Sequence, residues 1–212
     1  DDFAYLITSS DGDDTLRFSQ EYAEIAGDGF TRRAIGFPSV TVESGGGQDS
    51  AILFGSSGDD TLDAAAGLVT FSVIGSQCRC EGFASVDVLA ASGGHDTATL
   101  AGGSGDDALE IRPDMVRLSG ADYAFRAKYF DEVLAEAGLG GDDSARLLDS
   151  ADAELLEASD NWARLSDADR HWLYTALAFS SVEAVSTGGD DVADVDPEVD
   201  FLTLIGDWLE PA

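Results

Sequence analysis

The sequence predicts an all-β protein: a right-handed parallel β-helix, or solenoid, of about four double-coil repeats with a short C-terminal capping helix. Three observations lead to this prediction. A unit of about 47 residues recurs along the chain, apolar residues alternate over short spans, and these spans end in turns rich in Gly, Asp and Ser. The expected repeats are residues 2–48, 49–95, 96–142 and 143–190, inside a repeat domain 1–195 that precedes a cap at 196–212.

The repeat is defined by residues that return at the same spacing. One column is the aspartate of an Asp-x-Ala-x-Leu frame, with Val in place of Leu in the last copy; its members are Asp2, Asp49, Asp96, Asp143 and Asp191. Apolar columns follow the same period, and the expected core is Leu6, Leu16, Ile25, Phe37 and Val40 with their later equivalents. Identical columns at a fixed period favour a solenoid in which each side chain stacks on its counterpart in the next rung.

Each repeat is interpreted as two coils of about 23 residues, a size that suits a three-sided β-helix. A propeller blade is the alternative at this period. A blade would need four antiparallel strands joined by hairpins, and the apolar runs are too short and too evenly stacked for that arrangement.

The fourth repeat and the C-terminal segment carry helix signals. Ser166 with Asp169 three residues later is a helix-capping pattern, although a longer rung over residues 173–179 fits the sequence equally well. Asp196 followed by Pro197 is a typical helix start. The apolar face of this predicted capping helix would consist of Val199, Leu202, Ile205 and Leu209.

Paired aspartates recur in the first three repeats. The stretches are SSDGDDTLR at 9–17, GSSGDDTLD at 55–63 and GGSGDDALE at 102–110. The last of them matches every specified position of the nine-residue unit GGxGxDxUx, and it therefore resembles the calcium-binding β-rolls of the RTX family. The resemblance covers less than half of each repeat, and it implies stacked turns that hold Ca²⁺ between them.

The same resemblance places calcium ligands at the paired aspartates. The candidate metal-binding residues are Asp13, Asp14, Asp59, Asp60, Asp106 and Asp107. Asp60 and Asp107 match the ligand aspartate of the motif, Asp14 matches less well, and Ala153 with Glu154 of the fourth repeat should bind poorly. The residues themselves leave an alternative, in which each aspartate accepts backbone N–H bonds within its turn and no metal is bound.

A second resemblance concerns the whole repeat. The stretch AKYFDEVLAEAGLGGDDSARLLDSA at 127–151 is similar to the repeats of large secreted proteins of planctomycete bacteria. This resemblance implies an extracellular or cell-surface location and no particular activity.

The composition restricts the partners of this chain. It has 42 acidic and 11 basic residues and a formal net charge of −31, which argues against binding nucleic acid or an anionic membrane. No apolar run is long enough to insert into a membrane. The charge favours cations or a high-salt setting. Cys78 and Cys80 are interpreted as buried free thiols, with a strained disulfide as the alternative.

Arginines at Arg33, Arg79 and Arg126 form the one basic column. They are expected to pair with neighbouring aspartates and so hold the rungs together; the alternative is a calcium–Asp–Arg groove that binds or cleaves a polysaccharide, as in pectate-lyase-like β-helices. The sequence favours the first interpretation. The expected function is a non-catalytic structural or adhesive module, a rigid acidic rod that spaces other domains.

The expected partners are other protein chains and, in the alternative, polysaccharide. Protein chains would dock through an uncapped N-terminal rung where Phe3 and Tyr5 lie beside unpaired strand edges. The start of the chain in mid-repeat predicts that it is the C-terminal part of a larger protein or assembly.

Overall fold

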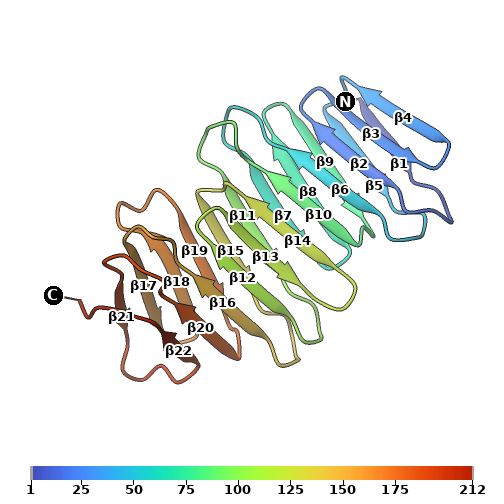
Figure 1. Cartoon of the computed structure of the whole chain (residues 1–212). Helices are drawn as coiled ribbons and strands as arrows, with labels where there is room; N and C mark the ends of the chain where they lie inside the picture. Colours follow the sequence, from blue (N-terminus) through green and yellow to red (C-terminus); the bar gives the residue numbers. More distant parts are fainter. Residues whose placement is uncertain (1, 212) are drawn as a thin grey trace. The chain divides into compact units, whose positions relative to one another are not determined.

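The computed structural model describes residues 2–211, and the regular structure within them consists of β-strands (Figure 1). Stacked parallel strand pairs, such as β1 with β5 and β6 with β10, define a β-solenoid. The prediction of an all-β solenoid is therefore confirmed. Over residues 2–211 there is no helix of the length and apolar character that a membrane span requires.

The strands are short and evenly distributed. Those of the first half of the chain are β1 (Phe3–Ile7), β2 (Thr15–Ser19), β3 (Tyr22–Gly27), β4 (Phe30–Ile35), β5 (Ser39–Glu43), β6 (Ser50–Phe54), β7 (Thr61–Ala65), β8 (Leu68–Val73), β9 (Ser76–Glu81), β10 (Ser85–Leu89) and β11 (Thr97–Ala101). Those of the second half are β12 (Ala108–Arg112), β13 (Met115–Ser119), β14 (Ala124–Lys128), β15 (Glu132–Glu136), β16 (Ser144–Leu148), β17 (Glu154–Ser159), β18 (Trp162–Asp167), β19 (Leu173–Leu177), β20 (Ser181–Val185), β21 (Val192–Val195) and β22 (Leu202–Ile205).

The strands of each repeat are divided between two sheets, A and B. The first and last strands of a repeat lie in one sheet, and the three strands between them lie in the other. In the first repeat β1 lies in sheet A, β2 to β4 form an antiparallel meander in sheet B, and β5 returns to sheet A. The second repeat has the same order with the sheets exchanged. Equivalent residues of consecutive repeats therefore lie in opposite sheets: Leu16 is on β2 of sheet B and Leu62 on β7 of sheet A. The prediction that each residue stacks on its counterpart in the next repeat is wrong.

The meanders explain this difference. Antiparallel hairpins were expected only if the repeat formed a propeller blade. Here they occur within a solenoid. Glycines at left-handed positions close two of the turns, Gly29 at φ 77° between β3 and β4 and Gly67 at φ 82° between β7 and β8. The apolar columns nine residues apart are cross-strand neighbours in these hairpins, as in the pairs Leu16 with Ile25 and Leu62 with Phe71.

The strands group into two compact units. One comprises the residues up to Ala98 together with Asp122–Phe130, and the other comprises Thr99–Ala121 and the residues from Asp131 onward. Sheet A has the order β1-β5-β9-β8-β7 in the first unit and β15-β19-β18-β17-β21 in the second. Sheet B has the order β14-β10-β6-β2-β3-β4 in the first unit and β22-β20-β16-β12-β13 in the second.

The core of each unit consists of the alternating apolar side chains that the sequence predicts. The columns that begin with Leu16, Ile25 and Val40 are buried in every repeat; their later members are Leu62, Leu109, Leu156, Phe71, Leu118, Leu165, Val86, Val133 and Val182. Three predicted core residues are not buried: Phe37 is 37% exposed, and Leu6 and Val195 are half-buried. Leu6 lies on β1, which has a partner strand on one side only within the described residues.

The predicted C-terminal capping helix is not present. Asp196 instead closes a turn, in which its Oδ1 accepts the N–H of Glu198 at 3.0 Å, and β22 then pairs in parallel with β20. A helix would satisfy its own backbone groups but leave those of β20 unpaired on this side, whereas the strand pairs both. The helix considered in the fourth repeat is also absent, since β18 ends at Asp167 and β19 begins at Leu173.

Candidate functional site

Four buried carboxylates join neighbouring coils near the start of their strands. The residues that supply them, each at most 4% exposed, are Asp49, Asp96, Asp143 and Asp191. Each Oδ1 accepts one backbone N–H from the paired-aspartate turn or its equivalent; the donors are, in the same order, Asp14 (2.8 Å), Asp60 (2.8 Å), Asp107 (2.8 Å) and Glu154 (3.0 Å). We call these four contacts the carboxylate clamps.

The clamps offset the desolvation of buried charge. A carboxylate removed from water is stable only if it accepts hydrogen bonds, and bonds to an ionised acceptor are stronger than neutral ones. The two effects oppose each other at Asp143. Burial raises the pKa of this carboxyl above its ordinary value, whereas the N–H of Asp107 acts to lower it.

The paired aspartates have backbone partners of their own. The second member of each pair accepts an N–H through Oδ2; these bonds are Ser9 to Asp14 at 2.5 Å, Ser56 to Asp60 at 2.7 Å and Gly103 to Asp107 at 2.7 Å. The first member accepts the N–H of the residue that precedes the next clamp; these bonds, all 2.8 Å, are Gln48 to Asp13, His95 to Asp59 and Asp142 to Asp106. Each pair of aspartates therefore accepts one backbone hydrogen bond from its own turn and one from the neighbouring coil.

The hydrogen bonds of the six paired aspartates have the pattern of the turn-capping alternative. Asp60 is 1% exposed and its two oxygens accept the N–H and the hydroxyl of Ser56, both at 2.7 Å. Across residues 2–211, no three carboxylates of these turns lie close enough to share an ion. The aspartates therefore match the turn-capping alternative of the sequence, and calcium at these six positions stays a prediction.

Glycine makes room for the paired turn in the second and third repeats. A Cβ at Gly102 would lie 2.4 Å from Oδ2 of Asp107 and 2.7 Å from the backbone nitrogen of Gly138. Gly55 stands in the same relation to Asp60, also at 2.4 Å. These glycines are required because the carboxylate needs the space that a side chain would fill.

The fourth repeat departs from this pattern and gathers three carboxylates. Asp149 takes the place of the glycine, and Glu154, one methylene longer, takes the place of the aspartate. One ligand atom each of Asp149, Glu154 and Asp191 lies within 4.8 Å of the others. We call this group the acidic triad. The sequence predicted that Glu154 would bind metal poorly, and it did not single out Asp149. The feature that could have indicated this site is the joint change of Gly to Asp at 149 and of Asp to Glu at 154.

Hydrogen bonds hold most of the triad's oxygens. Asp149 accepts the N–H of Thr187 at 2.7 Å and its hydroxyl at 2.8 Å, and Asp191 accepts the hydroxyl of Ser186 at 2.8 Å. Oε1 of Glu154 accepts the hydroxyl of Ser150. Oε2 of Glu154 is buried and has no hydrogen-bond partner.

Within residues 2–211, no cationic side chain balances the triad. None of the ion pairs over residues 2–211 includes one of its three members. Two ionised carboxylates no more than 4.8 Å apart repel each other by at least about 3.5 kcal/mol at an effective dielectric constant of about 20. Burial raises the pKa of Glu154, Ser150 acts to lower it, and Asp191 raises it again, so that the net direction is upward.

The basic column does not form a groove. Arg33 lies on β4 and Arg126 on β14 of sheet B, whereas Arg79 lies on β9 of sheet A. Each forms an exposed ion pair: Arg33 with Glu24 at 3.8 Å, Arg79 with Glu81 at 2.6 Å, and Arg126 with Asp87. The expected pairing with an aspartate of a neighbouring rung is confirmed at Arg126, whose partner Asp87 lies on β10. Arg33 and Arg79 pair instead with glutamates, on the adjacent strand of the same meander and on the same strand.

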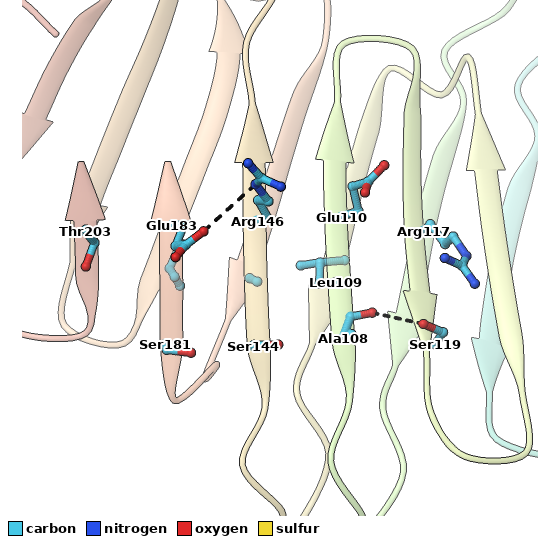
Figure 2. Close-up of a pocket in the computed structure, with 12 residues that line it drawn as sticks. Ala108, Leu109, Glu110, Arg117, Ser119, Ser144, Arg146, Ser181, Glu183 and Thr203 are labelled. Atoms are coloured by element: carbon cyan, nitrogen blue, oxygen red, sulfur yellow. Dashed lines mark hydrogen bonds and ion pairs between the residues drawn. The ribbon is translucent and has the colours of Figure 1, made fainter. Parts of the chain in front are cut away.

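An open groove of about 470 Å³ lies on sheet B of the second unit (Figure 2). Its charged residues form one row across the strands, in the order Arg117, Glu110, Arg146 and Glu183. Nε of Arg146 lies 3.9 Å from Oε2 of Glu183, and the other two point outward from the neighbouring strands (Figure 2). Alternating charges stabilise the sheet as cross-strand pairs, and they leave no excess of positive charge for an anionic polymer.

The two cysteines are buried and free, as predicted. Their Sγ atoms lie 3.8 Å apart. The contact with Cys80 and burial raise the pKa of the Cys78 thiol, which makes it a poor nucleophile.

The fold and these contacts define a class: an acidic β-solenoid whose repeats are joined by buried carboxylates. Comparisons of the chain with protein-family models, with curated proteins and with solved structures gave no match.

Proposed function

We propose that the chain is a non-catalytic structural or adhesive module of an extracellular or cell-surface assembly. The carboxylate clamps carry this proposal, because a buried carboxylate at each of four successive positions of the repeat binds the backbone of a neighbouring coil. These buried carboxylates are held by backbone hydrogen bonds, and their role in this proposal is to stabilise the fold. Most of the other acidic side chains are exposed or half-buried, and their negative charge favours solubility and attracts cations.

Calcium is proposed to stabilise this module. A net charge of −31 opposes the compact state, and a bound divalent cation would reduce that repulsion. Thermal melting at low ionic strength tests this part of the proposal. Chelation should lower the melting temperature and calcium chloride should restore it, whereas equal melting temperatures would contradict calcium dependence.

The proposed partner is another protein chain, and the proposed location is outside the cell. Exposed Phe3 and Tyr5 on β1 support a protein contact, and the similarity to secreted repeat proteins supports the location. Antibody labelling of intact cells tests the location. Signal that requires permeabilised cells would place the protein inside and count against the assembly.

A lyase activity is the competing function, and an assay on polyuronates separates the two. Incubation with these polymers and calcium should yield no unsaturated product, measured by ultraviolet absorbance. Product that disappears in Arg79→Ala would establish the lyase instead. Arg112→Ala is the matched control, because Arg112 forms the same kind of exposed pair, with Glu110 at 2.7 Å, that Arg79 forms with Glu81.

A further inference from the structure

The acidic triad lies in the repeat where the RTX-like motif is absent. The second and third repeats offer two carboxylates at the corresponding place, Asp60 with Asp96 and Asp107 with Asp143. The fourth repeat adds a third, because Asp149 stands where those repeats have glycine. The triad is therefore a local addition to the clamp and not a copy of it.

A second observation points to a ligand. Glu154 is 3% exposed, and its Oε2 has no hydrogen-bond partner although it is enclosed by the protein. A buried carboxylate oxygen without a donor is costly and rare in folded proteins. Ser150 fixes the other oxygen, so the group cannot turn Oε2 toward solvent without the loss of that bond.

We infer that Asp149, Glu154 and Asp191 bind one divalent cation, and that Ca²⁺ is the ion that suits them best. Calcium binds oxygen ligands at about 2.3–2.6 Å, so carboxylate oxygens within 4.8 Å of one another can all contact one ion. The triad offers oxygen without nitrogen or sulfur, which disfavours zinc and copper. The inference deepens the proposed calcium dependence and rests on it, but it moves the site away from the paired aspartates.

Calcium titration of the whole chain, after chelator treatment and dialysis, tests the site. Calorimetry with calcium chloride should show binding with a Kd of about 10⁻⁴–10⁻³ M, the range of extracellular calcium modules. Glu154→Gln keeps the shape of the side chain and removes its charge. This variant should remain folded by circular dichroism and bind calcium at least about tenfold more weakly, and calcium should no longer raise its melting temperature.

Asp60→Asn is the matched control, because it changes the equivalent residue in a repeat that lacks the third carboxylate. Its calcium affinity should equal that of the unchanged chain. Loss of binding in Asp60→Asn with full binding in Glu154→Gln would overturn the inference and keep calcium dependence. Absence of calcium binding by the unchanged chain would overturn both the triad site and the proposed calcium dependence. A second variant, Asp149→Asn, should also weaken calcium binding, as Glu154→Gln does.

Discussion

Asp96 shows how a single residue joins two coils of this solenoid. It is 1% exposed, and its Oδ1 accepts the N–H of Asp60 at 2.8 Å. Asp96→Ala leaves that N–H without its partner, so the free energy of unfolding should fall by about 2–3 kcal/mol. Chemical denaturation measures the change. Asp63→Ala, at an exposed position of β7, should change stability by less than about 0.5 kcal/mol, and an equal loss in both variants would contradict a specific role of the clamp.

The pair of His171 and Asp167 gives the chain a pH-dependent contact. Nδ1 of the histidine lies 2.7 Å from Oδ2 of the aspartate, and this hydrogen bond raises the pKa of His171. Burial acts to raise the pKa of Asp167, but the N–H of Trp172 and His171 itself bring it below the ordinary value. The raised histidine pKa means that its stabilising effect is complete below its unfolded value of about 6.5 and is lost as pH rises through the folded one.

The aspartate acts in the opposite direction at low pH. Its lowered pKa means that its stabilising effect is present above its unfolded value of about 3.9 and is lost as pH falls through the folded one. The contact therefore contributes most between about pH 4 and 6.5. NMR titration of the ring protons should give His171 a pKa above that of a free histidine. Asp167→Asn should lower the pKa of His171 toward the free value, with Asp169 still acting to raise it, and an unchanged titration would contradict the pairing.

Among the elements, β22 shows what decides between two local structures. The sequence from Asp196 to Leu209 carries a helix cap and a helical spacing of apolar residues, yet residues 202–205 form a strand. The parallel ladder is fixed by contacts outside the segment: Val182 donates its N–H to Phe201 at 2.9 Å and Ser186 donates to Ile205 at 2.8 Å. The edge of β20 therefore overrides the local helix preference.

Proline substitution in β22 tests the strand. The carbonyls of Phe201 and Ile205 face β20, so the odd-numbered residue between them, Thr203, also directs its backbone groups toward β20. Thr203→Pro should lower the free energy of unfolding by at least about 1 kcal/mol and speed hydrogen exchange in β20. Leu204→Pro, whose N–H points to the open side, should have a smaller effect. Equal damage by both would favour a helix, because proline breaks a helix at either position.

The period of the repeat was sufficient to predict the solenoid and most of its core, since columns such as that of Leu16 are buried in every copy. The exchange of sheets from one repeat to the next was not predictable from the repeated residues alone. The length of the repeat does not say how many strands lie between equivalent residues of two consecutive repeats. Asp28-Gly29 does carry a hairpin signal in the sequence. The acidic triad depends on the register between β17 and β21, which local patterns do not specify.

At the level of the whole molecule, exposed strand edges decide which surfaces can associate. The outermost strand of sheet B in the first unit, β4, carries Arg32 and Arg33, and charged side chains on an edge discourage pairing with another chain. The outermost strand of sheet A, β1, carries Phe3 and Tyr5 instead, which are 71% and 51% exposed. The two edges therefore differ in their capacity to accept a further strand.

This difference predicts self-association through β1. Within residues 2–211, β1 has a partner strand on one side only, so its outer edge and its exposed aromatic side chains should pair with a second copy of the 212-residue chain, which gives a dimer at high protein concentration. Phe3→Lys places a charge on this edge and should yield a monomer by size-exclusion chromatography with light scattering. Phe54→Lys is the control: Phe54 is 37% exposed on β6, which has partners on both sides, and its substitution should leave the dimer intact. A monomer at high concentration whose β1 amides are protected from hydrogen exchange would contradict association through this strand.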